Sequence, residues 1–164
     1  MKRIYLSLLL LCIGAQSAAA VDFKWMNMQG DIHSLSQDYP HQPVLVHVWA
    51  SWCGPCRAEM PEMAAWLNKH PNVKVIPVSL DNDIATAQSF LKTQHIALPA
   101  LLTDQQQASY LGIRGLPTTI LINAQGQMMD RRIGMQDWSY QPWTDEVEAL
   151  FPSPVHASKA VVSD

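Results

Sequence analysis

Two cysteines separated by two residues, Cys53 and Cys56, constrain this chain more than any other feature. A dithiol at this spacing can close into a small disulfide ring and open again, which is two-electron chemistry without a bound cofactor. Gly54 and Pro55 form a short, stiff bridge between the two cysteines. The third cysteine, Cys12, lies in a segment predicted to be removed, so no structural disulfide scaffold is expected. The pair is there to react or to bind.

The first twenty residues follow the three-part plan of a secretory signal peptide. A positive start at Lys2 and Arg3 precedes an apolar run and a small-residue site that ends at Ala20. The apolar run is shorter than the ~20 residues that comfortably span a membrane. We therefore predict cleavage after Ala20 and export from the cytoplasm. An uncleaved N-terminal membrane anchor is the alternative.

The rest of the chain has the composition of one globular domain. Apolar residues make up 48% and charged residues 15%, which separates the chain from disordered proteins. The formal net charge is −3 and no block of Lys or Arg stands out, so no nucleic-acid partner is expected. The predicted organisation is a signal peptide at 1–20, a single domain at 21–151 and a disordered Ser/Pro/Ala-rich tail at 152–164.

The apolar pattern predicts a mixed sheet with helices on both faces, an α/β fold. Residues 44–49 form an unbroken apolar run that is typical of a buried central strand, and a helix follows from 55 to about 70. A second strand is expected at 73–80. The remaining predictions are an N-terminal hairpin within 23–35, a helix from 82 or 83 to 94, a short strand at 98–102, one helical turn at 109–111, hairpin strands at 118–123 and 127–133, and a closing helix at 143–151.

The dithiol lies where the first buried strand passes into a helix. A cysteine is nucleophilic as the thiolate, and an unperturbed thiol has a pKa of ~8.5. The unpaired N–H groups and the positive end of a helix favour negative charge on Cys53. Cys56 follows one turn later. This placement predicts that Cys53 attacks a disulfide and that Cys56 resolves the mixed disulfide.

The order of the motifs resembles the thioredoxin superfamily, which carries the run from Trp49 to Cys56 and, later, a loop like residues 112–119. The resemblance implies a thioredoxin-like three-layer α/β/α fold and thiol-disulfide oxidoreductase activity with no cofactor. It also implies a cis peptide bond before Pro117, facing the dithiol. Substrate contact is expected at Trp52, Gly54, Pro55 and Leu116, with Leu116 offering its backbone to an extended client.

Within that superfamily the chain is similar to the TlpA/ResA/DsbE branch of periplasmic proteins. The shared features are the signal segment, the N-terminal hairpin, an inserted helix–strand segment between residues 81 and 109, and Glu59 three positions after Cys56. The resemblance implies a periplasmic reductant of protein disulfides that receives electrons from a membrane thiol carrier. Its clients would be apocytochromes c, in cytochrome c maturation, or copper-protein assembly factors.

Two residues are candidates for managing protons at the dithiol. His47 stands where cytosolic thioredoxins carry a buried aspartate. It is either a proton acceptor for Cys56, a cation that lowers a thiol pKa, or a neutral core histidine. Glu59 is either a buried acid that assists proton transfer or a solvated helix carboxylate.

Two other functions stay open at this point. A charged His47 would favour the reduced form and make the protein a disulfide-forming oxidant. A copper-binding chaperone without turnover would use the dithiol or the sulfur and imidazole groups near the N-terminus, namely Met26, Met28, His33 and His41. We assign no metal site. A peroxidase is excluded, because thioredoxin-fold peroxidases need a threonine where this chain has Ala50.

Overall fold

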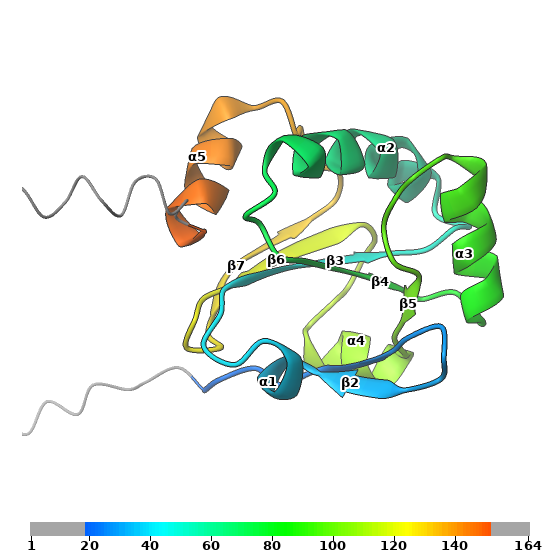
Figure 1. Ribbon diagram of the computed structural model, residues 1–164, viewed down its shortest axis with the longest axis horizontal. Coiled ribbons are helices and arrows are strands. Elements are labelled where there is room, and N and C mark those ends of the chain that lie inside the picture. The colour runs from blue at the N-terminus through cyan, green and yellow to red at the C-terminus, as the bar shows by residue number, and fades with distance from the viewer. Residues whose placement is uncertain (1–18, 152–164) are drawn as a thin grey trace, which may run out of the picture.

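A seven-stranded mixed sheet forms the centre of residues 19–151, the part of the chain that the computed structural model describes. The strand order is β2-β1-β5-β4-β3-β6-β7, with helices above and below it (Figure 1). This is the three-layer α/β/α arrangement expected from the sequence. Most of the predicted signal peptide, and the tail at 152–164, lie outside the described residues, so those boundaries stay predictions.

The middle of the sheet is β3 (Val44–Trp49), in which every residue is buried. It runs parallel to β4 (Val75–Ser79) and antiparallel to β6 (Thr118–Ile122). A strand covered on both faces needs apolar side chains at successive positions, which explains the unbroken run that marks it in the sequence. The ends of β3 and β4 place the segment that carries the dithiol.

Further strands extend the sheet on both sides. The predicted N-terminal hairpin is present as β1 (Lys24–Met26) and β2 (Ile32–Ser34), and β1 joins the sheet through β5 (Leu101–Leu102). At the other edge, β7 (Met128–Ile133) pairs antiparallel with β6. The inserted segment therefore links the N-terminal hairpin to the central strands.

Two apolar clusters lie on opposite faces of the sheet. One contains side chains of α2 (Gly54–Lys69), α3 (Ile84–Thr93) and α5 (Gln141–Leu150). The other joins side chains of β1, β3, β4 and β6 to Leu35 of α1 (Leu35–Asp38) and to Leu111, which follows α4 (Gln105–Tyr110). Figure 1 shows α1 and α4 on the lower side of the sheet. No helix in residues 19–151 is long and apolar enough to cross a bilayer.

The helical turn expected at 109–111 needs correction, because it is the end of the longer helix α4. Asp104 caps this helix by accepting a hydrogen bond from the Gln107 backbone N–H at 2.7 Å. Three consecutive glutamines fill its first turn and provide no apolar period, so pattern reading found only its final residues. The four-residue helix α1 was not predicted at all.

Candidate active site

The start of α2 carries the two cysteines, joined as a disulfide with their Cα atoms 5.3 Å apart. Cys53 is the N-cap residue, in extended conformation, and its Sγ accepts a hydrogen bond from the Cys56 backbone N–H at 3.3 Å. The unpaired N–H groups of a helix start stabilise negative charge on this sulfur. The local fold therefore favours Cys53 as the thiolate of the reduced pair.

Burial separates the two cysteines. Cys56 is fully buried, whereas Cys53 keeps 7% of its surface exposed. Its neighbour Trp52 is 68% exposed, and Gly54 and Pro55 are also exposed. A Cβ added at Gly54 would meet no atom within 4 Å, so the bridge between the cysteines faces open space. A docking protein can reach Cys53 and its exposed neighbours but cannot reach Cys56.

The predicted cis peptide bond between Leu116 and Pro117 is present. The Gly134 backbone N–H donates to the Pro117 carbonyl at 2.8 Å, and Thr118 Oγ1 donates to the Gly115 carbonyl at 2.7 Å. Leu116 is half-buried and packs against the apolar cluster that includes both cysteines. The loop and the dithiol, sixty residues apart in the sequence, are thus parts of one site.

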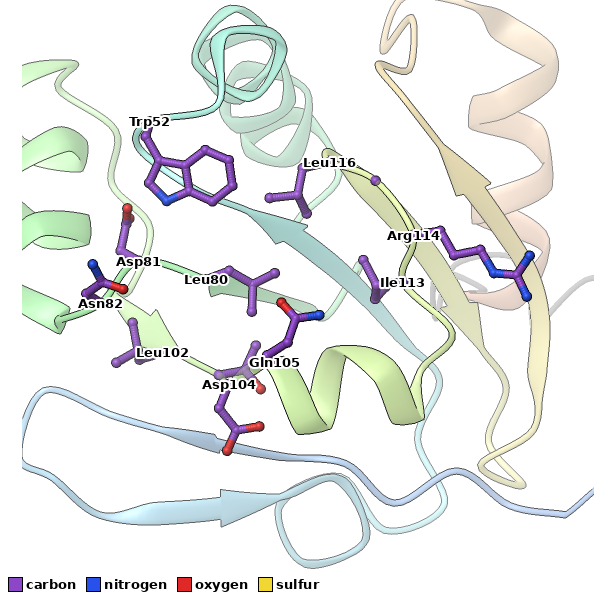
Figure 2. Close-up of a pocket in the computed structure, with 12 residues that line it drawn as sticks. Trp52, Leu80, Asp81, Asn82, Leu102, Asp104, Gln105, Ile113, Arg114 and Leu116 are labelled. Atoms are coloured by element: carbon purple, nitrogen blue, oxygen red, sulfur yellow. The ribbon is translucent and has the colours of Figure 1, made fainter.

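A pocket of about 550 Å³ opens beside Trp52. Figure 2 shows Trp52 and Leu116 at the end of the pocket that lies under α2, whereas the Arg114 side chain points away from it. Apolar side chains supply much of the surface between them and α4. The lining residues are Trp52, Leu80, Asp81, Asn82, 102–105 and 113–116. Two predicted substrate-contact residues, Trp52 and Leu116, therefore line one cavity, and Trp52 directly precedes Cys53 in the chain.

Asp81 holds the segment that precedes the dithiol. Its carboxylate accepts hydrogen bonds from the Ser51 backbone N–H at 3.1 Å, from Ser51 Oγ at 2.8 Å and from Ser79 Oγ at 2.7 Å. The side chain is 4% exposed. Sequence reasoning missed this residue, although a signal was present. Asp81 follows β4, and the carboxyl ends of adjacent parallel strands meet at one edge of a sheet.

We expect Asp81→Ala to lower the free energy of unfolding by about 2 kcal/mol, because it leaves the buried Ser79 donor and the half-buried Ser51 donors without their acceptor. Urea denaturation followed by circular dichroism measures the change. Asp145→Ala removes an exposed carboxylate of α5 and is the matched control. Equal losses in the two variants would contradict a structural role specific to Asp81.

Glu59 is fully buried, which excludes the alternative of a solvated helix carboxylate. Its Oε1 accepts hydrogen bonds from Trp138 Nε1–H at 2.8 Å and from the Gln136 backbone N–H at 3.2 Å, whereas Oε2 has no partner among the described residues. Burial raises the pKa of this carboxyl above its usual value, and the two hydrogen bonds partly oppose the rise. Glu59 can therefore hold a proton one helical turn from Cys56.

His47 is also fully buried, in the middle of β3. Its Nδ1 lies 3.1 Å from Thr119 Oγ1, its Nε2 has no partner among residues 19–151, and its ring meets the edge of Trp138. Burial lowers the pKa of the imidazole to about 3, so the ring is neutral near pH 7. This argues against a cation that lowers a thiol pKa and leaves a neutral ring with one free acceptor or donor.

Two of the N-terminal sulfur and imidazole groups, those of His33 and Met28, make hydrogen bonds within the protein. His33 Nδ1 lies 2.6 Å from Asp38 Oδ2, and His33 Nε2 lies 2.9 Å from Asn27 Nδ2. Met28 Sδ accepts from Gln88 Nε2 at 3.1 Å. Within the described part of the chain, no three His, Cys, Asp or Glu side chains form a group that could hold a metal ion.

The family follows from comparison with known proteins. A model of the AhpC/TSA family matches residues 17–131, which include the dithiol, the cis-proline loop and the strands between them. The chain belongs to the AhpC/TSA family. The chain is similar to thiol-disulfide oxidoreductases named DsbE and ResA, which confirms the resemblance stated from the motifs.

Individual relatives match along most of their length. Thiol:disulfide interchange protein DsbE of Pseudomonas fluorescens is 30% identical over 139 residues, covering 84% of this chain and 76% of the relative. Sporulation thiol-disulfide oxidoreductase A of Bacillus subtilis is 28% identical over 138 residues, covering 80% and 82%. A crystal structure of a DsbE-type protein from Chlorobium tepidum superposes with a TM-score of 0.71 at 27% identity, covering 82% and 96%. The fold is thioredoxin-like, and the chain is a thiol-disulfide oxidoreductase.

Proposed function

We propose that this protein is exported to the bacterial periplasm, where it reduces disulfides in client proteins through Cys53 and Cys56. The observation that carries the proposal is the pairing of one reachable and one fully buried cysteine at a helix start. The cis-proline loop beside them supports the binding of an extended client segment along Leu116. The signal-like N-terminal sequence supports export.

The reaction proceeds by two thiol–disulfide exchanges. The Cys53 thiolate attacks one sulfur of the client disulfide and forms a mixed disulfide with it. The client S–S bond breaks, and the other client sulfur leaves and takes up a proton. Cys56 then loses its proton and attacks Cys53 Sγ, which releases the second client sulfur. The client gains two electrons and two protons. The protein ends with the Cys53–Cys56 disulfide seen in the structure.

The second exchange needs an acceptor for the Cys56 proton in a dry interior. Glu59 lies three residues after Cys56 on the same helix, burial raises the pKa of its carboxyl, and its Oε2 has no partner among the described residues. We assign Glu59 the role of taking this proton. His47, neutral and buried in β3, adds an Nε2 that has no partner among the described residues.

The direction of electron flow is decided by the reduction potential. The protein is equilibrated in thiol/disulfide redox buffers, and the dithiol fraction is read by alkylation and mass spectrometry. We expect a potential near that of thioredoxin, about −270 mV, because the neutral His47 ring adds no charge that would favour the thiolate. A potential near about −120 mV would instead identify a disulfide-forming oxidant.

The clients are proposed from the resemblance to the TlpA/ResA/DsbE branch and from the predicted export together. Sequence resemblance to the DsbE and ResA proteins favours apocytochromes c, with copper-protein assembly factors as the second class. Electrons would come from a membrane thiol carrier. A Cys56→Ser variant expressed in the native envelope should capture the client as a mixed disulfide. Recovery of proteins without cysteine pairs would contradict this assignment.

A further inference from the structure

A tryptophan outside the dithiol motifs holds the Glu59 carboxyl in place. Trp138 lies in the loop between β7 and α5, is 2% exposed, and donates its indole N–H to Glu59 Oε1 at 2.8 Å. The same loop supplies the Gln136 backbone N–H to that oxygen at 3.2 Å. Both donors therefore bind one carboxylate oxygen and leave Oε2 unpaired among the described residues.

The indole is itself fixed from several sides. Its ring centroid lies 5.3 Å from that of Trp66 and 5.7 Å from that of Trp143, and its edge faces His47 at 6.3 Å. At the start of the loop, Gly134 takes a positive φ of 93° and donates its N–H to the Pro117 carbonyl. A side chain packed this tightly has little freedom to turn its N–H away from Glu59.

We propose that Trp138 is a positioning residue for thiol–disulfide exchange, which fixes the Glu59 carboxyl and sets the pH at which it exchanges a proton with Cys56. The inference rests on the proton-transfer role proposed for Glu59 above. An N–H donated to a carboxylate favours its charged form, so this bond opposes the effect of burial. Without it, Glu59 would hold its proton to higher pH.

The other ionisable groups around Glu59 belong to α2, β3, β7, the loop after β7 and α5. Their charges could also change the pKa of the Glu59 carboxyl. Glu62, on α2, adds a small repulsion that raises the Glu59 pKa. The His47 ring is neutral near pH 7. Arg132 of β7 pairs with Asp130 and Glu146 and lies over the Trp143 ring, and Asp137 accepts from Ser139. The same helix also carries Cys56, the exposed Arg57 near its start and the exposed Lys69 at its end.

The test measures Glu59 directly rather than through turnover. Carbon-13 NMR follows the Glu59 carboxyl of the reduced protein through a pH titration, with its signal identified by its absence in Glu59→Gln. In Trp138→Phe we expect the titration midpoint to rise by about one pH unit, since the ring stays but its donor is lost. An unchanged midpoint would overturn the proposal. Insulin reduction is assayed separately, so a failure of the proposed function remains distinguishable.

Trp143→Phe is the matched control, because Trp143 Nε1 has no hydrogen-bond partner among the described residues. Its midpoint should equal that of the wild type. A shift equal to that of Trp138→Phe would assign the effect to packing and would overturn the specific role of Trp138. In a Glu59→Gln background, adding Trp138→Phe should leave the pH profile of Cys53 alkylation unchanged.

A measurement on the wild type needs no variant to fold. The Trp138 Nε1–H resonance should move with the same midpoint as the Glu59 carboxyl, because its acceptor gains or loses charge there. The Trp143 Nε1–H resonance should move less. A Trp138 resonance that stays constant while Glu59 titrates would show that the two groups do not share the bond that the proposal requires.

Discussion

Cys53→Ser should abolish disulfide reduction, lowering the rate of insulin reduction by about three orders of magnitude or more. Serine cannot form the S–S bond of the mixed disulfide, and Cys56 is fully buried and cannot replace it. The variant should stay folded, because the remaining contacts of the helix start do not need a sulfur atom. Turbidity of insulin with dithiothreitol as electron donor measures the loss.

Cys56→Ser should allow the first step, the attack on the client disulfide, and block the second, the resolution of the mixed disulfide. Cys53→Ser stops both steps. The reachable thiol still attacks, but no second sulfur resolves the product, so a covalent complex with the client accumulates. Non-reducing electrophoresis detects this complex, and dithiothreitol releases it. Activity in Cys53→Ser comparable to wild type, or no trapped complex in Cys56→Ser, would reverse or remove the assigned roles.

His47 should make the protein labile to acid, with the second-largest effect that we expect. The imidazole has a pKa near 6.5 in the unfolded chain and about 3 in the folded protein, so below pH 6.5 the unfolded state binds a proton that the folded state does not. Stability is therefore lost as pH falls through this window. Between pH 7 and pH 4.5 the loss from His47 is about 2–3 kcal/mol.

The contribution of His47 is identified by how steeply the free energy of unfolding falls as the pH is lowered, and not by its value at one pH. His47→Asn is less stable overall, but it should lose the part of the pH dependence that belongs to the imidazole. Glu59 acts in the opposite direction, since a raised pKa in the folded state lowers stability as pH rises above its unfolded value. Urea midpoints from pH 4 to pH 7 measure both. His95→Asn, at an exposed position with a positive φ, is the control; a parallel slope in His47→Asn and wild type would refute the assignment.

Much of the fold could be predicted because its elements have strong local patterns. The buried run of β3 and the hairpin of β6 and β7 were located to within one residue at each end, and Asp83 was one of two expected caps for α3. Weaker patterns misled the prediction. The polar first turn of α4 hid its start, and a four-residue helix such as α1 has too few positions to show a period.

The candidate site divides in the same way. The dithiol and the cis-proline loop are contiguous motifs, so their residues could be named from the sequence alone. Trp138 and Thr119 could not, because they act through contacts with residues 79 and 72 positions away in the chain. The charge state of His47 was left open between a cation and a neutral core histidine. Its complete burial in β3 favours the neutral ring.

The open space around Gly54 has a consequence for how such a protein can change. A side chain introduced at position 54 would clash with no core residue, because an added Cβ meets nothing within 4 Å. Gly54, one of the two residues between the cysteines, can therefore vary while the scaffold keeps its stability. A substitution at position 54 can therefore change the reduction potential of the dithiol and the choice of client without lowering the stability of the fold.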